Sequence, residues 1–110
     1  MNALLSVILH SGGVCPREAI AVHCHETHGR ALDNIDVALD IHGIRVVDSA
    51  IGGLGGCPFA GPGAPGNVAT ELVVSHLLNK GYRFDSAINL HALKEIGTWI
   101  RSVLRNLTPS

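Results

Sequence analysis

Residues 19–25 read AIAVHCH, an apolar run that ends in polar side chains. This pattern is typical of a buried strand in a parallel sheet, whose carboxyl end reaches solvent or a ligand. Side chains alternate between the two faces of a strand, so His23 and His25 share one face, about 7 Å apart, and Cys24 faces the other. The two imidazoles are therefore placed to bind one cation together, and Cys24 is expected to pack in the core.

A second apolar run at residues 44–51 is rich in β-branched side chains and predicts a second strand, covered on both faces. Apolar residues at helical spacing predict helices around and between the strands. The predicted helices lie near residues 4–9, at 30–42, at 68–80 and from 88 to 104, with Gly43 and Gly81 as stops, Ser86 as an N-cap and Gly97 as a weak point. Alternating helices and strands favour an α/β fold with right-handed crossovers.

The composition narrows the class of protein. The 110 residues are enough for one domain at most, and 46% of them are hydrophobic and only 15% charged, as expected where helices cover a sheet. A net charge of −1 and a pI near 6.6 provide no basic stripe for nucleic acid. The early apolar run, residues 3–9, is too short to span a membrane.

The cysteines indicate the compartment. The three cysteines form no CxxC pair, which argues against a disulfide framework and for a reducing compartment. The cytoplasm is the expected location, or the mitochondrial matrix if a leader precedes the chain. The remaining histidines, His10, His42, His76 and His91, are expected at the surface or half-buried.

Residues 52–66 contain seven glycines and three prolines. This density is also found in flexible linkers, but Cys57 lies inside the segment and Asn67 follows it. Because catalytic residues of barrel enzymes lie on loops at the carboxyl ends of strands, the segment is interpreted as a site loop. A phosphate loop is the weaker interpretation, since the GK[ST] ending and spaced GxGxxG are missing. Asn67 is also a good N-cap candidate for the helix after it.

Two motifs carry a family resemblance. The segments HCHETHG at residues 23–29 and VVDSAIGGLGGCPFAGPGAPGNVATE at 46–71, with the spacing between them, resemble the 3-hydroxy-3-methylglutaryl-CoA (HMG-CoA) lyase family. The resemblance implies that residues 1–110 form the C-terminal fragment of a (β/α)₈ TIM barrel, with its last two parallel strands and flanking helices. A whole barrel needs about 250 residues. Glu26 and His28 depart from the Asp and Tyr commonest in the family.

The resemblance also implies a chemistry: carbon–carbon cleavage of an acyl-CoA substrate to acetoacetate and acetyl-CoA. The implied metal ligands are His23, His25 and Asn67; His23 and Cys57 are the implied catalytic residues, and Gly55 and Gly56 belong to the substrate loop. Two imidazoles, an amide oxygen and a carboxylate suit Mg²⁺ or Mn²⁺ better than Zn²⁺. The family's carboxylate ligand stands beside a catalytic arginine on the first barrel strand, and this sequence has no Arg-Asp pair. The chain is therefore expected to be inactive alone.

Other interpretations stay open at this stage. A His-x-His pair on a strand is often a chance pair, and only the nearby site loop favours the metal. A truncated sheet exposes an edge and an apolar face, so the chain could instead be a non-catalytic module that self-associates or binds a partner. A homo-oligomer is expected. A related aldolase or synthase is a further alternative, against which Cys57 on the glycine-rich loop argues.

Overall fold

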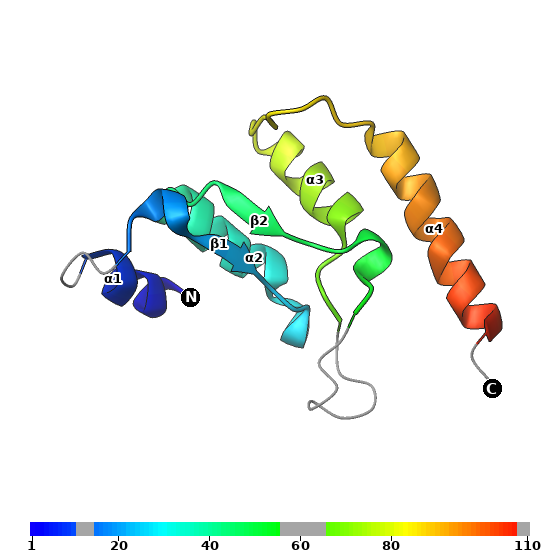
Figure 1. Ribbon diagram of the computed structural model, residues 1–110, viewed down its shortest axis with the longest axis horizontal. Coiled ribbons are helices and arrows are strands. Elements are labelled where there is room, and N and C mark those ends of the chain that lie inside the picture. The colour runs from blue at the N-terminus through cyan, green and yellow to red at the C-terminus, as the bar shows by residue number, and fades with distance from the viewer. Residues whose placement is uncertain (11–14, 56–65, 108–110) are drawn as a thin grey trace.

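The computed structural model describes residues 1–10, 15–55 and 66–107 (Figure 1). Gly56 and Cys57 lie outside the described residues. The chain forms helices α1 (Asn2–His10), α2 (Ala31–Asp36), α3 (Thr70–Asn79) and α4 (Leu90–Leu107), strands β1 (Ala21–His23) and β2 (Val46–Asp48), and short helical turns η1 (Arg17–Ala19), η2 (Thr27–Gly29), η3 (Val37–Ile41) and η4 (Ile51–Gly53).

The two predicted strands are present and pair in parallel. Ala21 lies opposite Val46, and His23 lies opposite Asp48. Both strands are shorter than predicted from residues 19–25 and 44–51. Strand β1 starts later than predicted because η1 occupies the chain up to Ala19, and β2 ends earlier because η4 begins at Ile51. Parallel pairing, and hence the α/β class, is confirmed.

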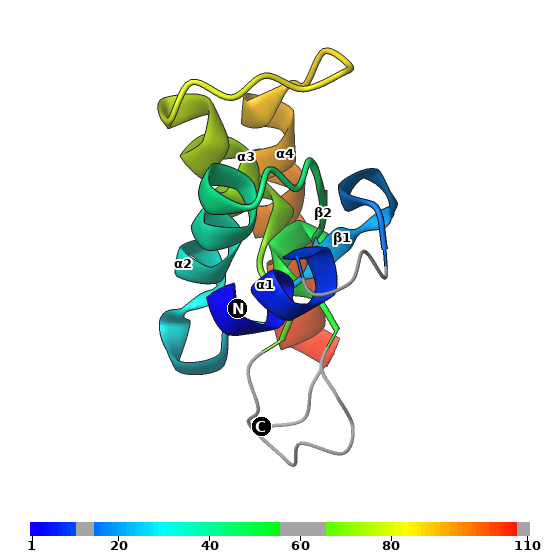
Figure 2. The ribbon, with the colours of Figure 1, turned by 90° about the vertical axis from the view of Figure 1, so that its left-hand side faces the viewer.

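One face of the sheet is covered and the other is open. On the covered face, Val22 and Cys24 are buried, so the predicted packing role of Cys24 is confirmed. Helices α2 and α3 lie on this side of the strands (Figure 2). The side chains fully enclosed there include Ile35, Ile44 and Val68. On the opposite face, the alternating residues Ala21, His23, Val46 and Asp48 are exposed.

The helix predicted at residues 30–42 is divided. Helix α2 passes directly into η3, a π-helical turn in which the His42 amide donates to the Val37 carbonyl oxygen at 3.3 Å. His42 follows this turn and is only 4% exposed, and its Nε2 lies 2.7 Å from the Asn2 side-chain oxygen. The prediction that His42 lies at the surface or half-buried is wrong, because this residue is buried.

The last helix begins later than predicted. Residues 82–89 cross from the end of α3 to the start of α4 (Figure 1), so Ser86 lies in this connection and does not cap the helix. Asn89 does so, because its side-chain oxygen accepts a hydrogen bond from the Ala92 amide at 3.0 Å. Helix α4 then packs against α3 and η4. Among the described residues, no helix is long and apolar enough to cross a membrane.

Candidate metal site

The segment that contains Asn67 lies beside the carboxyl end of β1. Asn67 faces His25 in an isolated antiparallel bridge. The Glu26 amide donates to the Gly66 carbonyl at 3.0 Å, and the Val68 amide donates to the Cys24 carbonyl at 3.1 Å. Directly opposite residues on paired strands project to the same face. The bridge therefore puts the Asn67 and His25 side chains on one side of the sheet.

His23 and His25 project together, as strand alternation predicts. Their ring centroids are 5.5 Å apart and the ring planes are inclined by 38°. Because a ligating ring nitrogen lies about 2.0–2.2 Å from its cation, two imidazoles on one ion have centroids roughly 4.5–6 Å apart. The spacing of this pair falls in that range. The side chain of His23 is 54% exposed, so the pair is open to solvent on the uncovered face of the sheet.

The Asn67 carboxamide makes one hydrogen bond and leaves its oxygen unused. Nδ2 donates to the Leu54 carbonyl oxygen at 2.8 Å. Oδ1 is buried and has no hydrogen-bond partner among the described residues. An unpaired buried acceptor costs about 1–3 kcal/mol, which a cation ligated by that oxygen would offset. The unused oxygen belongs to the residue that faces His25, and divalent cations accept oxygen and imidazole ligands, so the residues present fit such an ion.

Asn67 does not cap the following helix, in contrast to the N-cap interpretation. Helix α3 begins at Thr70, its N-cap position is Ala69, and no side chain caps it. The amide of Asn67 is instead tied to the loop that leaves η4. The reason is spacing, because Asn67 is bridged to His25, two residues beyond β1, and lies three residues before the helix starts.

Gly55 packs directly on Asn67. The Gly55 carbonyl accepts a hydrogen bond from the Asn67 backbone amide at 2.9 Å. Gly55 has a φ of +85°, and a Cβ there would lie 2.8 Å from Asn67 Nδ2. The predicted loop residue Gly55 is thus close to the predicted ligand Asn67 and has no space for a side chain.

Asp48 is a site neighbour that the sequence interpretation missed. It lies opposite His23 in the sheet, and its Oδ2 is 3.7 Å from His23 Nδ1. The signal that could have found it is positional, because a residue at the same level of the neighbouring strand shares the face of His23. Within the described part of the chain, no cluster of three or more His, Cys, Asp or Glu side chains could hold a metal. The candidate site therefore depends on the amide of Asn67.

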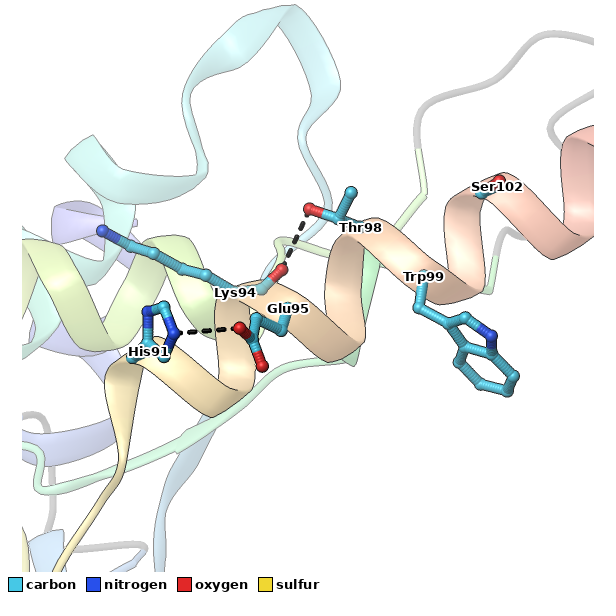
Figure 3. Close-up of a pocket in the computed structure, with 6 residues that line it drawn as sticks. All are labelled: His91, Lys94, Glu95, Thr98, Trp99 and Ser102. Carbon is cyan, nitrogen blue, oxygen red and sulfur yellow. Dashed lines mark hydrogen bonds and ion pairs between the residues drawn. The ribbon is translucent and has the colours of Figure 1, made fainter.

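A surface hollow on α4 does not belong to this site. Figure 3 shows its lining side chains, all of which come from the outer face of that single helix: His91, Lys94, Glu95, Thr98, Trp99 and Ser102. The Trp99 ring points away from the rest of the helix in this view and is 62% exposed. None of the predicted site residues lines this hollow.

Comparison with known proteins decides the family. The family model described as HMGL-like matches residues 4–100. The chain belongs to the HMGL-like family. Hydroxymethylglutaryl-CoA lyase from chicken (Gallus gallus), a mitochondrial protein, is 50% identical over 110 residues, which are 100% of this chain and 35% of the relative. The cytoplasmic 3-hydroxy-3-methylglutaryl-CoA lyase from human is 50% identical over 95 residues, covering 86% of this chain and 25% of the relative.

Solved structures of HMG-CoA lyases agree with this assignment. HMG-CoA lyase from Brucella melitensis superposes with a TM-score of 0.77 at 40% identity, covering 94% of this chain and 35% of the other. An HMG-CoA lyase from Acinetobacter baumannii, solved with coenzyme A and 3-methylmalate, gives 0.78 at 36% identity, with 94% and 32% covered. The expected correspondence to part of a TIM-barrel lyase is confirmed. The chain spans about a quarter to a third of the length of the relatives it matches.

Proposed function

We propose that this chain supplies part of the active site of an HMG-CoA lyase, which cleaves a carbon–carbon bond of HMG-CoA to give acetoacetate and acetyl-CoA. The similarity to lyases over about a third of their length supports the reaction class. The observation that carries the proposal for this chain is the buried Oδ1 of Asn67, which has no hydrogen-bond partner in the described residues and lies on the same side as His25.

His23, His25 and Asn67 would hold a divalent cation, Mg²⁺ or Mn²⁺. When bound, such a cation stabilises the negative charge that develops on oxygen as the carbon–carbon bond breaks. The two imidazoles project from one face of the strand. The Asn67 Nδ2 group is occupied by its hydrogen bond to the Leu54 carbonyl, so the carboxamide oxygen is the atom left to ligate the metal. Asp48, beside His23, would favour one orientation of that ring.

The glycine-rich segment would cover the acyl-CoA substrate. Gly55 and Gly56 would belong to this substrate loop, and Cys57 and His23 would be the catalytic residues. Glycine suits this segment because a loop that folds closely over a ligand needs positive φ and room for backbone contact. The φ of +85° at Gly55 supports this.

The isolated chain would lack activity. Its sequence has no Arg-Asp pair to supply the arginine and the carboxylate ligand of the first barrel strand. The second candidate function is a non-catalytic module that forms a homo-oligomer. It is favoured by the open sheet face, where Val46 is 49% exposed, since parallel sheets are normally covered on both faces.

Metal binding is tested with the purified chain and Mn²⁺ by titration calorimetry. His23→Ala, His25→Ala and Asn67→Ala should each weaken binding by about tenfold or more, since each removes one ligand. His91→Ala is the matched control, because this histidine is 84% exposed on α4. Equal Mn²⁺ affinities for all four variants and the unchanged chain would refute the proposed ligand set.

The reaction is tested by complementation. The chain alone should show no HMG-CoA cleavage with Mn²⁺ or Mg²⁺, and coexpression with the first two thirds of a related lyase, which carries the Arg-Asp strand, should produce it. Cys57→Ser should lower that turnover, and Cys15→Ser should leave it unchanged.

Turnover by the chain alone would show that the arginine and the carboxylate are dispensable. If the chain and the coexpressed lyase fragment form an assembly of normal size and metal content that does not cleave HMG-CoA, the non-catalytic module would be favoured. Sizing chromatography of the chain alone tests the homo-oligomer.

A further inference from the structure

Glu71 is a buried carboxylate that joins three elements. It lies in the first turn of α3 and is only 8% exposed. Its Oε1 accepts a hydrogen bond from the Gly52 amide in η4 at 3.0 Å, and its Oε2 accepts one from Arg101 Nη1 of α4 at 3.0 Å. A buried charge is tolerated only when it is paired and hydrogen-bonded. Glu71 thus ties α3, η4 and α4 together.

Gly97 provides the space for this carboxylate. A Cβ at Gly97 would lie 2.0 Å from Glu71 Oε2 and 2.8 Å from its carboxyl carbon. The sequence predicts that a glycine within α4 costs about 1 kcal/mol relative to alanine. The close approach gives a reason for that cost, since any side chain would push the Glu71 carboxylate away from both of its partners.

The contacts continue from Glu71 to the candidate ligand. Gly52 and Leu54 belong to one tight turn, in which the Leu54 amide donates to the Ile51 carbonyl at 3.3 Å. The Leu54 carbonyl in turn accepts the hydrogen bond from Asn67 Nδ2. The turn is therefore anchored by Glu71 at the Gly52 amide and by Asn67 at the Leu54 carbonyl. Its position decides where the Asn67 amide points, and thereby where Oδ1 points.

We propose that Arg101 and Gly97 of α4 are positioning residues for Asn67, acting through Glu71 and the Gly52–Leu54 turn. Arg101 fixes the carboxylate, Gly97 leaves room for it, the carboxylate fixes the turn, and the turn fixes the carboxamide (Figure 1 shows α4 beside α3 and η4). The consequence for metal binding rests on the proposed function, but the consequence for the Asn67 side chain does not.

The positioning is tested first without metal, by NMR of the full chain. Gly97→Ala and Arg101→Gln should shift the Asn67 side-chain amide resonance and speed hydrogen exchange at the Gly52 amide by about tenfold, as that bond opens. Arg101→Lys should restore most of both signals, because lysine can still pair with Glu71. The matched controls are Ser102→Ala and Arg105→Gln, exposed positions on the same helix, and they should leave both signals unchanged.

The second measurement is Mn²⁺ affinity, which should fall about tenfold in Gly97→Ala and Arg101→Gln and stay unchanged in both controls. An unmoved Asn67 amide resonance in Arg101→Gln would overturn the positioning proposal, and this variant decides alone if Gly97→Ala does not fold. If the unchanged chain binds no Mn²⁺, the proposed metal site fails, and the Asn67 and Gly52 signals still decide the positioning.

Discussion

Gly55 and Asn67 are in such close contact that a Cβ on the glycine would lie 2.8 Å from the Nδ2 atom of the asparagine. The same Nδ2 donates to the Leu54 carbonyl. The glycine is thus required by the neighbouring carboxamide as well as by its own φ of +85°. This close approach, together with the hydrogen bond from the Asn67 backbone amide to the Gly55 carbonyl, links the start of the glycine-rich segment to the candidate ligand.

Gly55→Ala should therefore disturb Asn67 as well as strain the backbone. We expect a loss of about 2–4 kcal/mol in the free energy of unfolding, from left-handed strain plus the broken hydrogen bond. Gly81→Ala is the control, because Gly81 has a φ of +94° and a Cβ at this position would meet nothing within 4 Å. In Gly81→Ala, backbone strain alone should lower the free energy of unfolding, by about 1–2 kcal/mol. Urea unfolding measures both, and equal losses would contradict the contact argument.

The carboxylates of Asp36 and Asp40 make stability depend on pH. Burial would raise the pKa of Asp36, but hydrogen bonds from Lys80 and His76 outweigh it and lower that pKa. Hydrogen bonds from Lys80 and Tyr82 lower the pKa of Asp40. Groups with lowered pKa stabilise the fold above their unfolded pKa, about 3.9, and lose this effect as pH falls through the folded value. The same hydrogen bonds raise the pKa of Lys80 to about 12.

Asp36→Asn should accordingly destabilise the chain at pH 7, and this difference should be lost as pH falls through the lowered pKa of the folded Asp36 carboxyl. The urea midpoints of the variant and the unchanged chain should begin to converge as pH falls below about 5, and they should continue to converge below about 3.9, the pKa of an unfolded Asp. Asp33→Asn, at an exposed position of the same helix, is the control and should shift little at any pH. A constant difference across this range would show that the Asp36 charge does not stabilise the fold.

The Cys24 thiol should resist alkylation in the folded chain. Burial raises its pKa, and the charge of Glu26 adds to this, although the N-terminal amine opposes it. Because the thiolate is the reactive form, iodoacetamide at pH 7.5 should label half-exposed Cys15 at least tenfold faster than Cys24. Mass spectrometry in a Cys57→Ser background measures the two rates. In urea they should become similar, and equal rates in the native chain would contradict the burial.

His28 adopts a left-handed backbone conformation, with φ 55° and ψ 21°. Its side chain is exposed, so we expect His28→Gly to stabilise the chain by about 0.5 kcal/mol, as relief of strain exceeds the added entropy of the unfolded state. His28→Val should destabilise it, because β-branched residues are outliers in this region. Thermal unfolding measures both variants, and a stable valine variant would show that no strain is present.

Features that depend on residues close together in the sequence, namely strand alternation and the glycine stops of helices, were predicted correctly. The alternation around Cys24 predicted which side chains are buried, and the stops at Gly43 and Gly81 are correct, with φ of +71° and +94°. Glu71 was missed as a functional candidate, because in a helical pattern it reads as one more polar residue. Its partners Gly52 and Arg101 are distant in sequence, so only the tertiary arrangement reveals them.

The errors have the same origin. Asn67 and Ser86 are good capping residues, but neither caps a helix. Asn67 is bridged to His25, and Ser86 lies in the connection before α4. Asp48 became visible as a neighbour of His23 only when the strand register was known. The roles of Cys57 and Gly56 stay predictions.

The open face of the sheet has a consequence for how a cation would be retained. With the His23 side chain 54% exposed, water reaches the imidazole pair from the side opposite the core. An ion bound there by the chain alone would be removed rapidly by a chelator in solution. Any assembly that buries this face would slow that exchange. The rate at which EDTA removes Mn²⁺ would therefore report how completely the open sheet face is covered.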